Sequence, residues 1–264
     1  MPPDLSFALA LIVKMAVTAG FVVAATVTAE RAGPLVGGLV ATLPLGAGPV
    51  YVFLALDHGA RFIGQSALGS LAINTVNVIF ALTYALLAQR WSLPVSLSLA
   101  MLLWFALAWG VNEIQWTVAS AGLLNLVVLP ACIAWARPLR HVAIPPLRTY
   151  WYDLALRAAL VAALVGVTVT LSYHIGPGGS GILAVFPIIL IGVILILHRR
   201  VGGKPTAAVM AHAVVGLVGF AVACIVLHYT AEPFGAVIGL SLALCTAVGW
   251  NLTVFAARRR GVTV

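Results

Sequence analysis

Two cationic side chains stand inside long apolar stretches of this sequence, and they have the clearest capacity for chemistry. Lys14 lies in the first apolar stretch, and Arg157 lies in another in the second half of the chain. A charge at the centre of a bilayer costs at least about 2.5 kcal/mol, so such residues commonly mark substrate or ion pathways. An anion crossing the membrane would meet one cation from each side. The alternative is that both side chains extend their charged ends to the lipid headgroups.

The spacing between Lys14 and Arg157, which we call the repeat interval, also relates two motifs rich in glycine and proline. Gly33-Pro34, Gly38 and Pro44 return as Gly176-Pro177, Gly181 and Pro187. Pro34 and Pro177 stand where a helix is expected to begin, a position that tolerates proline. We expect Pro44 and Pro187 to lie inside their helices, where each removes a backbone hydrogen bond. The motifs therefore predict two hinges, at Gly38/Pro44 and Gly181/Pro187, that line a cavity, with simple kinks as the alternative.

Four further polar residues fall within apolar stretches: Asn74, Asn77, His212 and Asn251. Such side chains either line a cavity or form hydrogen bonds between helices. We group these four with Lys14 and Arg157 as candidate substrate-binding residues.

The sequence contains no pattern that is typical of an enzyme or a metal site. It has no HExxH motif, no paired carboxylates within apolar stretches and no Ser/His pair on facing helices. Cys132, Cys224 and Cys245 stand singly, and we expect them to be small buried residues. We therefore expect no catalytic residue, no metal and no cofactor.

The elements that must position these residues are membrane-spanning helices. Hydrophobic residues make up 63% of the chain and charged residues 8%, and the mean hydropathy is +1.14. Soluble domains have about 45–50% apolar and about 25% charged residues. The long unbroken apolar runs favour helices over a membrane β-barrel. The sequence predicts an all-α, polytopic membrane helix bundle with about nine transmembrane helices, near residues 6–29, 34–56, 62–88, 93–111, 114–136, 151–173, 179–198, 205–229 and 233–257.

The basic residues indicate how the chain is oriented. Eleven of the 14 Lys and Arg residues fall on one side of a nine-span trace, and only Arg61 falls in a loop on the other side. The eleven are Arg31, Arg90, Arg137, Arg140, Arg148, Arg199, Arg200, Lys204, Arg258, Arg259 and Arg260. The positive-inside rule then predicts an outside N-terminus and a cytoplasmic C-terminus. This distribution explains the net charge of +8. We therefore expect the lipid bilayer to be a partner of the chain and expect no binding of nucleic acid.

The repeat divides the chain into three parts. Residues 1–112 form repeat 1 with four spans, residues 149–264 form repeat 2 with four spans, and residues 113–148 form a linker span with a basic cytoplasmic loop. The first apolar run follows Met-Pro-Pro-Asp without basic residues, so we expect a retained helix and not a signal peptide. Because five spans separate equivalent helices, the second repeat is expected to cross the membrane in the opposite direction. The result is a 4+1+4 inverted-topology repeat.

A further set of motifs occupies the first half. These motifs are Lys14, Glu30-Arg31, the stretch from Gly37 to Leu45, Leu56-Asp57-His58-Gly59, Leu93-Pro94 and the segment from Trp104 to Trp109. They resemble the small four-helix bacterial inner-membrane proteins of the GlpM type, which are about half as long and are associated with alginate production. In the second half, Arg157 replaces the lysine. The resemblance implies a fused, oppositely oriented pair of GlpM-like units in the bacterial inner membrane.

Two functions are consistent with these features. The first is a membrane transporter or flippase that works by alternating access at the repeat interface, with an anionic small molecule or a lipid-linked phosphate as substrate. The alternative is a non-transporting accessory or scaffold protein of envelope polysaccharide assembly, which the resemblance implies by association. A channel ranks third, since the sequence has no ring of like side chains. Whether the protein forms a homodimer is left open.

Overall fold

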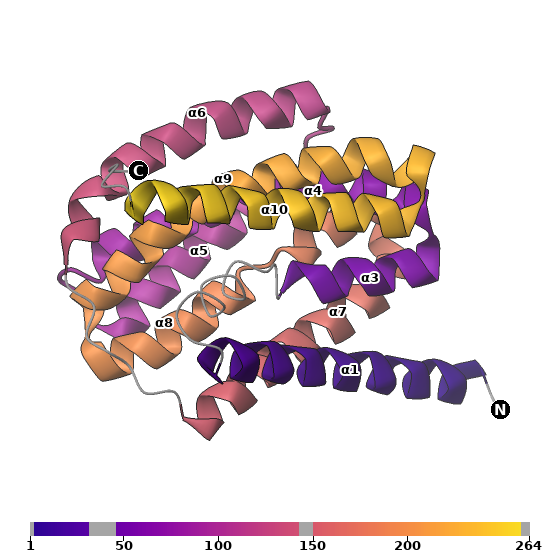
Figure 1. Cartoon of the computed structure of the whole chain (residues 1–264), viewed down its shortest axis with the longest axis horizontal. Coiled ribbons are helices and arrows are strands. Elements are labelled where there is room, and N and C mark those ends of the chain that lie inside the picture. Colours follow the sequence, from indigo (N-terminus) through magenta and orange to yellow (C-terminus); the bar gives the residue numbers. More distant parts are fainter. Residues whose placement is uncertain (1–2, 32–45, 143–149, 260–264) are drawn as a thin grey trace.

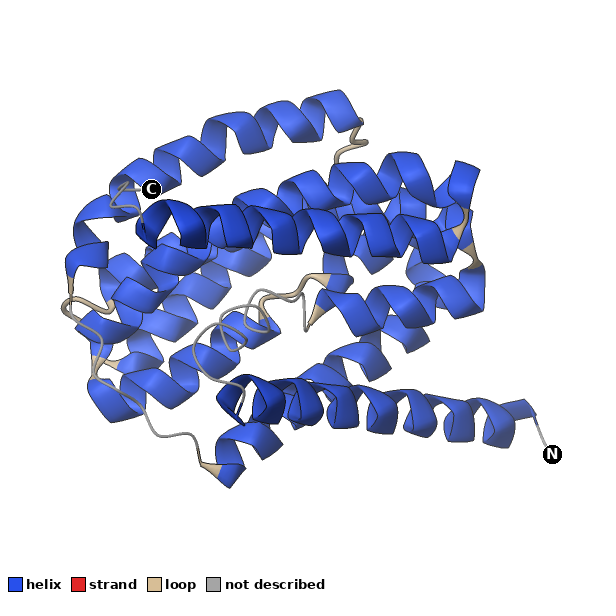
Figure 2. Cartoon of the chain, viewed as in Figure 1, coloured by secondary structure: helices blue, strands red, loops and turns tan. Residues whose placement is uncertain are grey.

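The computed structural model describes residues 3–31, 46–142 and 150–259. Within these ranges the chain forms helices joined by short connections, without any strand (Figure 2). The first half contains α1 (Pro3–Arg31), α3 (Ala47–His58), α4 (Ala60–Leu87) and α5 (Leu93–Asn112). Next come α6 (Val118–Ala136) and the short 3-10 helix η1 (Arg137–His141). The second half contains α7 (Trp151–Ala184), α8 (Ile188–Val201), α9 (Gly203–Phe234) and α10 (Ala236–Arg259).

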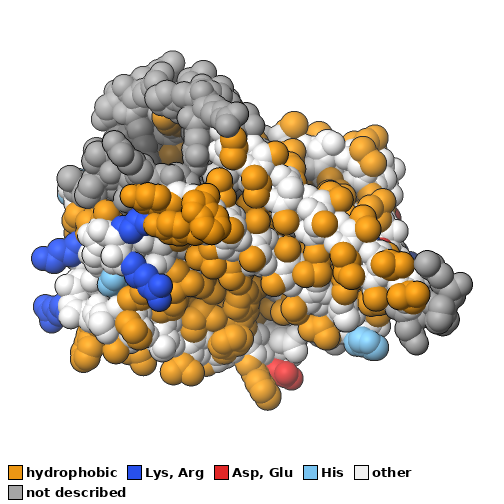
Figure 3. All heavy atoms as spheres, turned by 90° about the horizontal axis from the view of Figure 1, so that it is seen from below, with side chains coloured by type: hydrophobic (Ala, Val, Ile, Leu, Met, Phe, Trp, Pro, Cys, Tyr) orange, Lys and Arg blue, Asp and Glu red, His pale blue; other side chains and the backbone are white. Residues whose placement is uncertain are grey.

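The apolar length of these helices identifies a multi-pass membrane protein. In the described part of the chain, seven segments are long and apolar enough to cross a membrane. One of them, Trp151–Val201, comprises both α7 and α8. On the face shown in Figure 3, hydrophobic side chains cover the middle of the molecule, and Lys and Arg side chains gather at one end. The predicted all-α class and membrane character are thus confirmed.

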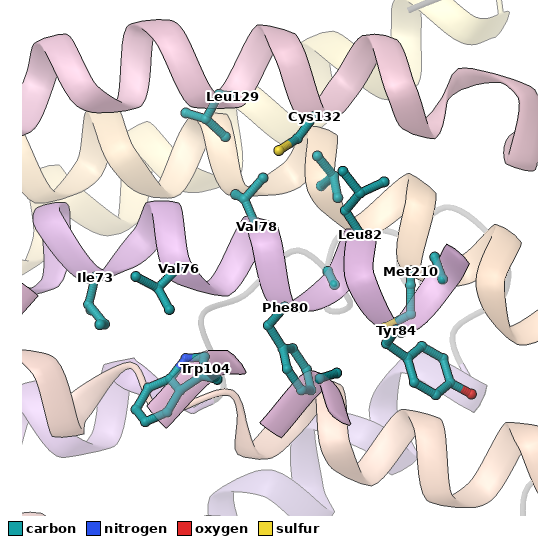
Figure 4. Packing of buried hydrophobic residues seen from close by; sticks show 14 of the residues in the cluster. Ile73, Val76, Val78, Phe80, Leu82, Tyr84, Trp104, Leu129, Cys132 and Met210 are labelled. Atoms are coloured by element: carbon teal, nitrogen blue, oxygen red, sulfur yellow. The ribbon is translucent and has the colours of Figure 1, made fainter. Parts of the chain in front are cut away.

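Helix α4 lies at the centre of the bundle. It packs against α5, α6, α7 and α9 (Figure 1). The most apolar window of α4 is 78% buried, whereas the corresponding windows of α1 and α10 are only 11% buried. In Figure 4, Val78 of α4 points toward Leu129 and Cys132 of α6, and Phe80 points to the opposite side. Because α4 is surrounded by protein, its polar side chains must find hydrogen-bond partners among its neighbours.

Several helix boundaries are separated by the repeat interval. Helix α3 ends at His58 and α8 at Val201, and α4 and α9 begin just beyond those ends. The intervening residues are Gly59 and Gly202, whose φ angles of 84° and 81° lie in the left-handed region that favours glycine. The starts of α5 and α10, at Leu93 and Ala236, are related by the same interval.

The prediction that Pro187 lies inside a helix is wrong. Helix α7 is interrupted at Gly176, which has a φ of 67°, and Pro177 begins a second helical segment, as expected. That segment ends at Ala184, and Pro187 is the N-cap residue of α8. Proline lacks the amide proton and clashes with the preceding turn, and at this position it separates two helices. Gly38 and Pro44, the corresponding predicted hinge residues of the first half, lie outside the described residues.

The cysteine prediction holds for two residues of three. Cys132 and Cys224 are buried, whereas Cys245 is exposed. Cys245 lies on α10, and this helix has most of its surface on the outside of the bundle. An apolar sequence does not by itself indicate burial within the protein, because lipid also accommodates apolar side chains.

Candidate functional site

The interruption between α7 and α8 lies in the interior of the bundle and is held by polar side chains of α4. Asn77 Nδ2 donates a hydrogen bond to the carbonyl oxygen of Val185 at 2.7 Å. Ser70 Oγ donates to the carbonyl oxygen of Gly181 at 2.6 Å. Asn77 in turn accepts a 2.7 Å hydrogen bond from Trp104 Nε1 of α5. Side chains of α4 thus replace backbone partners that an unbroken helix would supply.

Close backbone contact accompanies these hydrogen bonds. A Cβ atom added to Gly181 would overlap the carbonyl oxygen of Ser66, and one added to Gly69 would overlap that of Gly178. Small residues at such positions allow two membrane helices to approach closely. Gly181, one of the predicted hinge residues, therefore serves as a contact point between α4 and the segment before the interruption.

A second polar cluster lies where α4 meets α6 and α9. Asn74 Nδ2 donates to Asn125 Oδ1 at 2.9 Å and to the carbonyl oxygen of Leu217 at 3.2 Å. Asn125 Nδ2 donates to the carbonyl oxygens of Leu71 and Ala121. Asn74 and Leu217 are separated by the repeat interval, so equivalent positions of α4 and α9 touch at this cluster. Asn74 Oδ1 is buried and has no hydrogen-bond partner among the described residues.

Lys14 is paired with a carboxylate. Its Nζ lies 2.5 Å and 2.6 Å from the two carboxylate oxygens of Asp57 at the end of α3. The side chains are 17% and 12% exposed, and the Lys14 ammonium also lies 5.9 Å from the ring centroid of Phe53. In this arrangement the positive charge of Lys14 is balanced within the protein.

The second half holds a different arrangement around Arg157. Arg200 Nη2 of α8 donates to Asp153 Oδ1 of α7 at 2.6 Å, and the Arg200 guanidinium stacks over the rings of Tyr150 and Tyr152. Arg157 lies one helical turn after Asp153, and its Nε is buried without a hydrogen-bond partner among the described residues. Of the two predicted cations, Arg157 is therefore the one that retains capacity to bind an added anion.

The two remaining candidates lie elsewhere. Asn251 Nδ2 donates to the carbonyl oxygen of Ala247 on its own helix α10. His212 of α9 lines a groove of about 1020 Å³ between α6, α9 and α10. The structure thus distributes the six predicted residues over several places, with Asn77 at the interruption, Asn74 at the α4–α9 contact and His212 at the groove.

Sequence reasoning missed Ser70 and Trp104 at the interruption, and it also missed three charged residues and one amide that the structure places in polar contacts. Asp57, Asp153 and Arg200 stand at span ends or in loops of the predicted trace, and Asn125 lies in the linker span, which has no counterpart in the repeat. A signal was available for Asn125, since an amide inside an apolar helix usually needs a partner. Cations within a membrane commonly pair with carboxylates, so Lys14 and Arg157 could have indicated that acidic residues lie nearby.

Within the described ranges, no group of three or more His, Cys, Asp or Glu residues is placed to hold a metal ion. A search of protein-family models, of curated proteins and of solved structures found no match for this chain.

Proposed function

We propose that this chain is a secondary transporter or flippase for an anionic or lipid-linked substrate, working by alternating access between two inverted four-helix repeats. In this proposal it is a fused pair of GlpM-like units in a bacterial inner membrane, with nine spans, an outside N-terminus and a cytoplasmic C-terminus. It uses no cofactor and carries out no covalent chemistry.

The observation that carries the proposal is the interrupted helix pair of α7 and α8. The segment Pro177–Ala184 and helix α8 contain about 22 helical residues, or about 33 Å at about 1.5 Å per residue. This is close to the roughly 30 Å of a hydrocarbon core, so together they match one crossing that is broken part-way. Non-helical backbone at membrane depth is tolerated where it is buried in protein or lines a cavity, and secondary transporters bind substrates at such breaks.

The repeat interval supports the inverted repeat. The ends of α3 and α8 are related by this interval, as are the starts of α4 and α9 and of α5 and α10. Gly59 and Gly202 share a backbone conformation, and Asn74 touches its equivalent position Leu217. A contact between equivalent positions is what a two-fold axis passing through the α4–α9 contact produces. Relative motion of the two repeats about this axis is the proposed transport movement.

Two features favour an anionic substrate. Helix α8 begins in the bundle interior, next to buried Val185 and Pro187, and the N-terminus of a helix carries a partial positive charge of about half a unit. Arg157 adds a full charge without a carboxylate partner among the described residues. Asn74, Asn77, His212 and Asn251 remain candidates for contacts along the path.

The test is flux in reconstituted vesicles. The purified chain is placed in liposomes loaded in turn with radiolabelled inorganic phosphate, sulfate or a fluorescent phosphatidylglycerol, and release or leaflet exchange is followed. We expect protein-dependent movement of at least one of these probes, and a slower rate for Arg157→Gln. The matched control is Arg199→Gln, which removes the same charge from an exposed position on α8.

The opposite result would favour the scaffold function. If folded protein moves none of these probes, transport of phosphate, sulfate and phosphatidylglycerol is excluded. Retention of a polysaccharide synthase on the purified chain, unaffected by Arg157→Gln, would then identify an accessory role.

A further inference from the structure

One face of α6 lines the groove of about 1020 Å³ from one end of the helix to the other. Gly122, Leu126, Leu129 and Ile133 recur at intervals of three or four residues, which places them on the same side of α6, and Arg137 of η1 follows four residues later. Across the groove lie residues of α9, and Trp250 of α10 contributes to the lining. Helix α6 runs beside α9 along an outer edge of the bundle (Figure 1). The walls are predominantly apolar.

Positive charge is confined to one end of this groove. Arg137, Arg140 and His141 of η1 line it there, and no Asp or Glu is among its lining residues in the described part of the chain. Deeper in the groove, the amide of Asn125 is already engaged by Asn74, Leu71 and Ala121. The polar atoms of Asn125 are therefore satisfied, and a hydrocarbon chain can lie against this residue without leaving a buried group unpaired.

The dimensions fit one lipid molecule. Gly122 of α6 and Arg137, which directly follows this helix, are fifteen residues apart, which is about 22 Å at about 1.5 Å per residue. One leaflet, half of a bilayer about 40–45 Å thick including headgroups, measures about 20–22 Å. The groove volume also lies at the upper end of the roughly 300–1,000 Å³ typical of small-molecule sites. A free inorganic anion would leave most of such a groove empty.

We propose that this groove binds an anionic glycerophospholipid of the surrounding bilayer. The phosphate lies at Arg137, Arg140 and His141, and an acyl chain lies between α6 and α9. Basic pockets between membrane helices recognise anionic headgroups in this way. The lipid joins the linker helix α6 to the second half of the chain. This site goes beyond the proposed transport function, because lipid occupancy does not require any movement of substrate.

The experiment is native mass spectrometry of the full chain released from micelles that contain equal amounts of phosphatidylglycerol and phosphatidylcholine. We expect a retained phosphatidylglycerol molecule in the unaltered chain. In the variant Arg137→Gln/Arg140→Gln, the preference for phosphatidylglycerol should fall, by about fivefold for each cation removed. The control Arg90→Gln/Arg199→Gln removes two exposed cations that do not line the groove, and it should keep the preference.

A second pair of variants tests whether an acyl chain occupies the apolar part of the groove. A Cβ at Gly122 would meet nothing within 4 Å, so Gly122→Leu is expected to extend into the groove and should abolish retention of either lipid. Gly110→Leu is the control, because Gly110 on α5 has equally open surroundings and does not line the groove. Unchanged lipid retention in Gly122→Leu, or an unchanged preference in the arginine double variant, would overturn the proposal. Because flux is not measured, a failure of transport leaves this result intact.

Discussion

The two halves of the molecule each join a long helix to a short one by an ion pair, but with opposite polarity. In the first half the cation is on the long helix α1, as Lys14, and the carboxylate is on the short helix α3, as Asp57. In the second half the carboxylate is on the long helix α7, as Asp153, and the cation is on the short helix α8, as Arg200. Both halves thus have an ion pair between a long and a short helix, but the helix that carries the cation differs between them.

This reversal leaves the halves unequal in charge. Arg157 and Arg200 occupy the positions equivalent to Lys14 and Asp57, so two cations replace a balanced pair, and Asp153 balances only one of them. A charge in a low-dielectric region is tolerated when it is paired, and removal of one partner is then costly. The first half therefore has a closed, neutral ion pair, whereas the second half has a site with an excess positive charge.

The largest effect is expected for Asp153→Asn. The Asp153 side chain is only 3% exposed, and the change removes the carboxylate that Arg200 Nη2 contacts, while it preserves a side-chain oxygen that can accept from the amide of Tyr150. Removing the buried carboxylate of an ion pair is strongly destabilising, because its cation then loses its partner in a region of low dielectric constant. Unfolding by sodium dodecyl sulfate in micelles, followed by circular dichroism, measures this loss. A loss smaller than that of Lys14→Met would show that the deeper burial of the second pair has no energetic consequence.

A smaller loss is expected when the first pair is broken. Lys14→Met leaves Asp57, which is 12% exposed, without its cation, and a hydrogen bond to a charged group contributes about 1.5–3 kcal/mol. The exchange Lys14→Asp/Asp57→Lys gives the first half the polarity of the second and should recover most of this stability. The same unfolding assay compares the variants. If the exchanged chain recovers no stability, the contact between α1 and α3 requires the cation on α1 and the carboxylate on α3, and an ion pair of either polarity is not sufficient.

Backbone packing gives a further comparison between the halves. Gly181→Ala forces a Cβ into the carbonyl of Ser66 and should destabilise the chain by about 1–3 kcal/mol, the usual cost of overpacking. Gly178→Ala is the control, since its Cβ meets nothing within 4 Å. The first-half equivalent of Gly181 is Gly38, so Gly38→Ala measures whether both halves pack alike. Equal unfolding free energies for Gly38→Ala and Gly181→Ala would indicate the same close contact in each half.

Much of the helix placement could be predicted because apolar runs and proline act locally. The expected spans near 62–88 and 93–111 correspond to α4 and α5 within a few residues, and Gly176-Pro177 separates two helical segments as expected. At Pro187 the sequence predicts a break inside one helix and not a boundary between two. Whether proline bends or ends a helix depends on partners for the freed carbonyls, and those partners, Asn77 and Ser70, come from a helix that is distant in the sequence.

The pairing of charges could not be predicted in the same way. Asp57 stands just before Gly59, which marks a loop, and only the folded arrangement brings the end of α3 beside Lys14 in α1. The repeat directs attention to Arg157 and away from Asp153, because the first half has Ala10 at the position equivalent to Asp153. A repeat predicts the features that the two halves share. Residues that differ between the halves, such as Asp153, can be assigned to a contact only from the structure.

Arg157→Gln should have the smallest effect on stability and a clear effect on transport. Because Arg157 Nε has no hydrogen-bond partner among the described residues, its removal should lower the free energy of unfolding by less than Lys14→Gln does. Anion flux in liposomes should nevertheless fall by about tenfold, which corresponds to a loss of about 1.4 kcal/mol of attraction. Lys14→Gln should instead lower stability through Asp57. If Arg157→Gln and Lys14→Gln destabilise the chain equally and leave flux unchanged, Arg157 is a structural cation and the two halves do not differ in function.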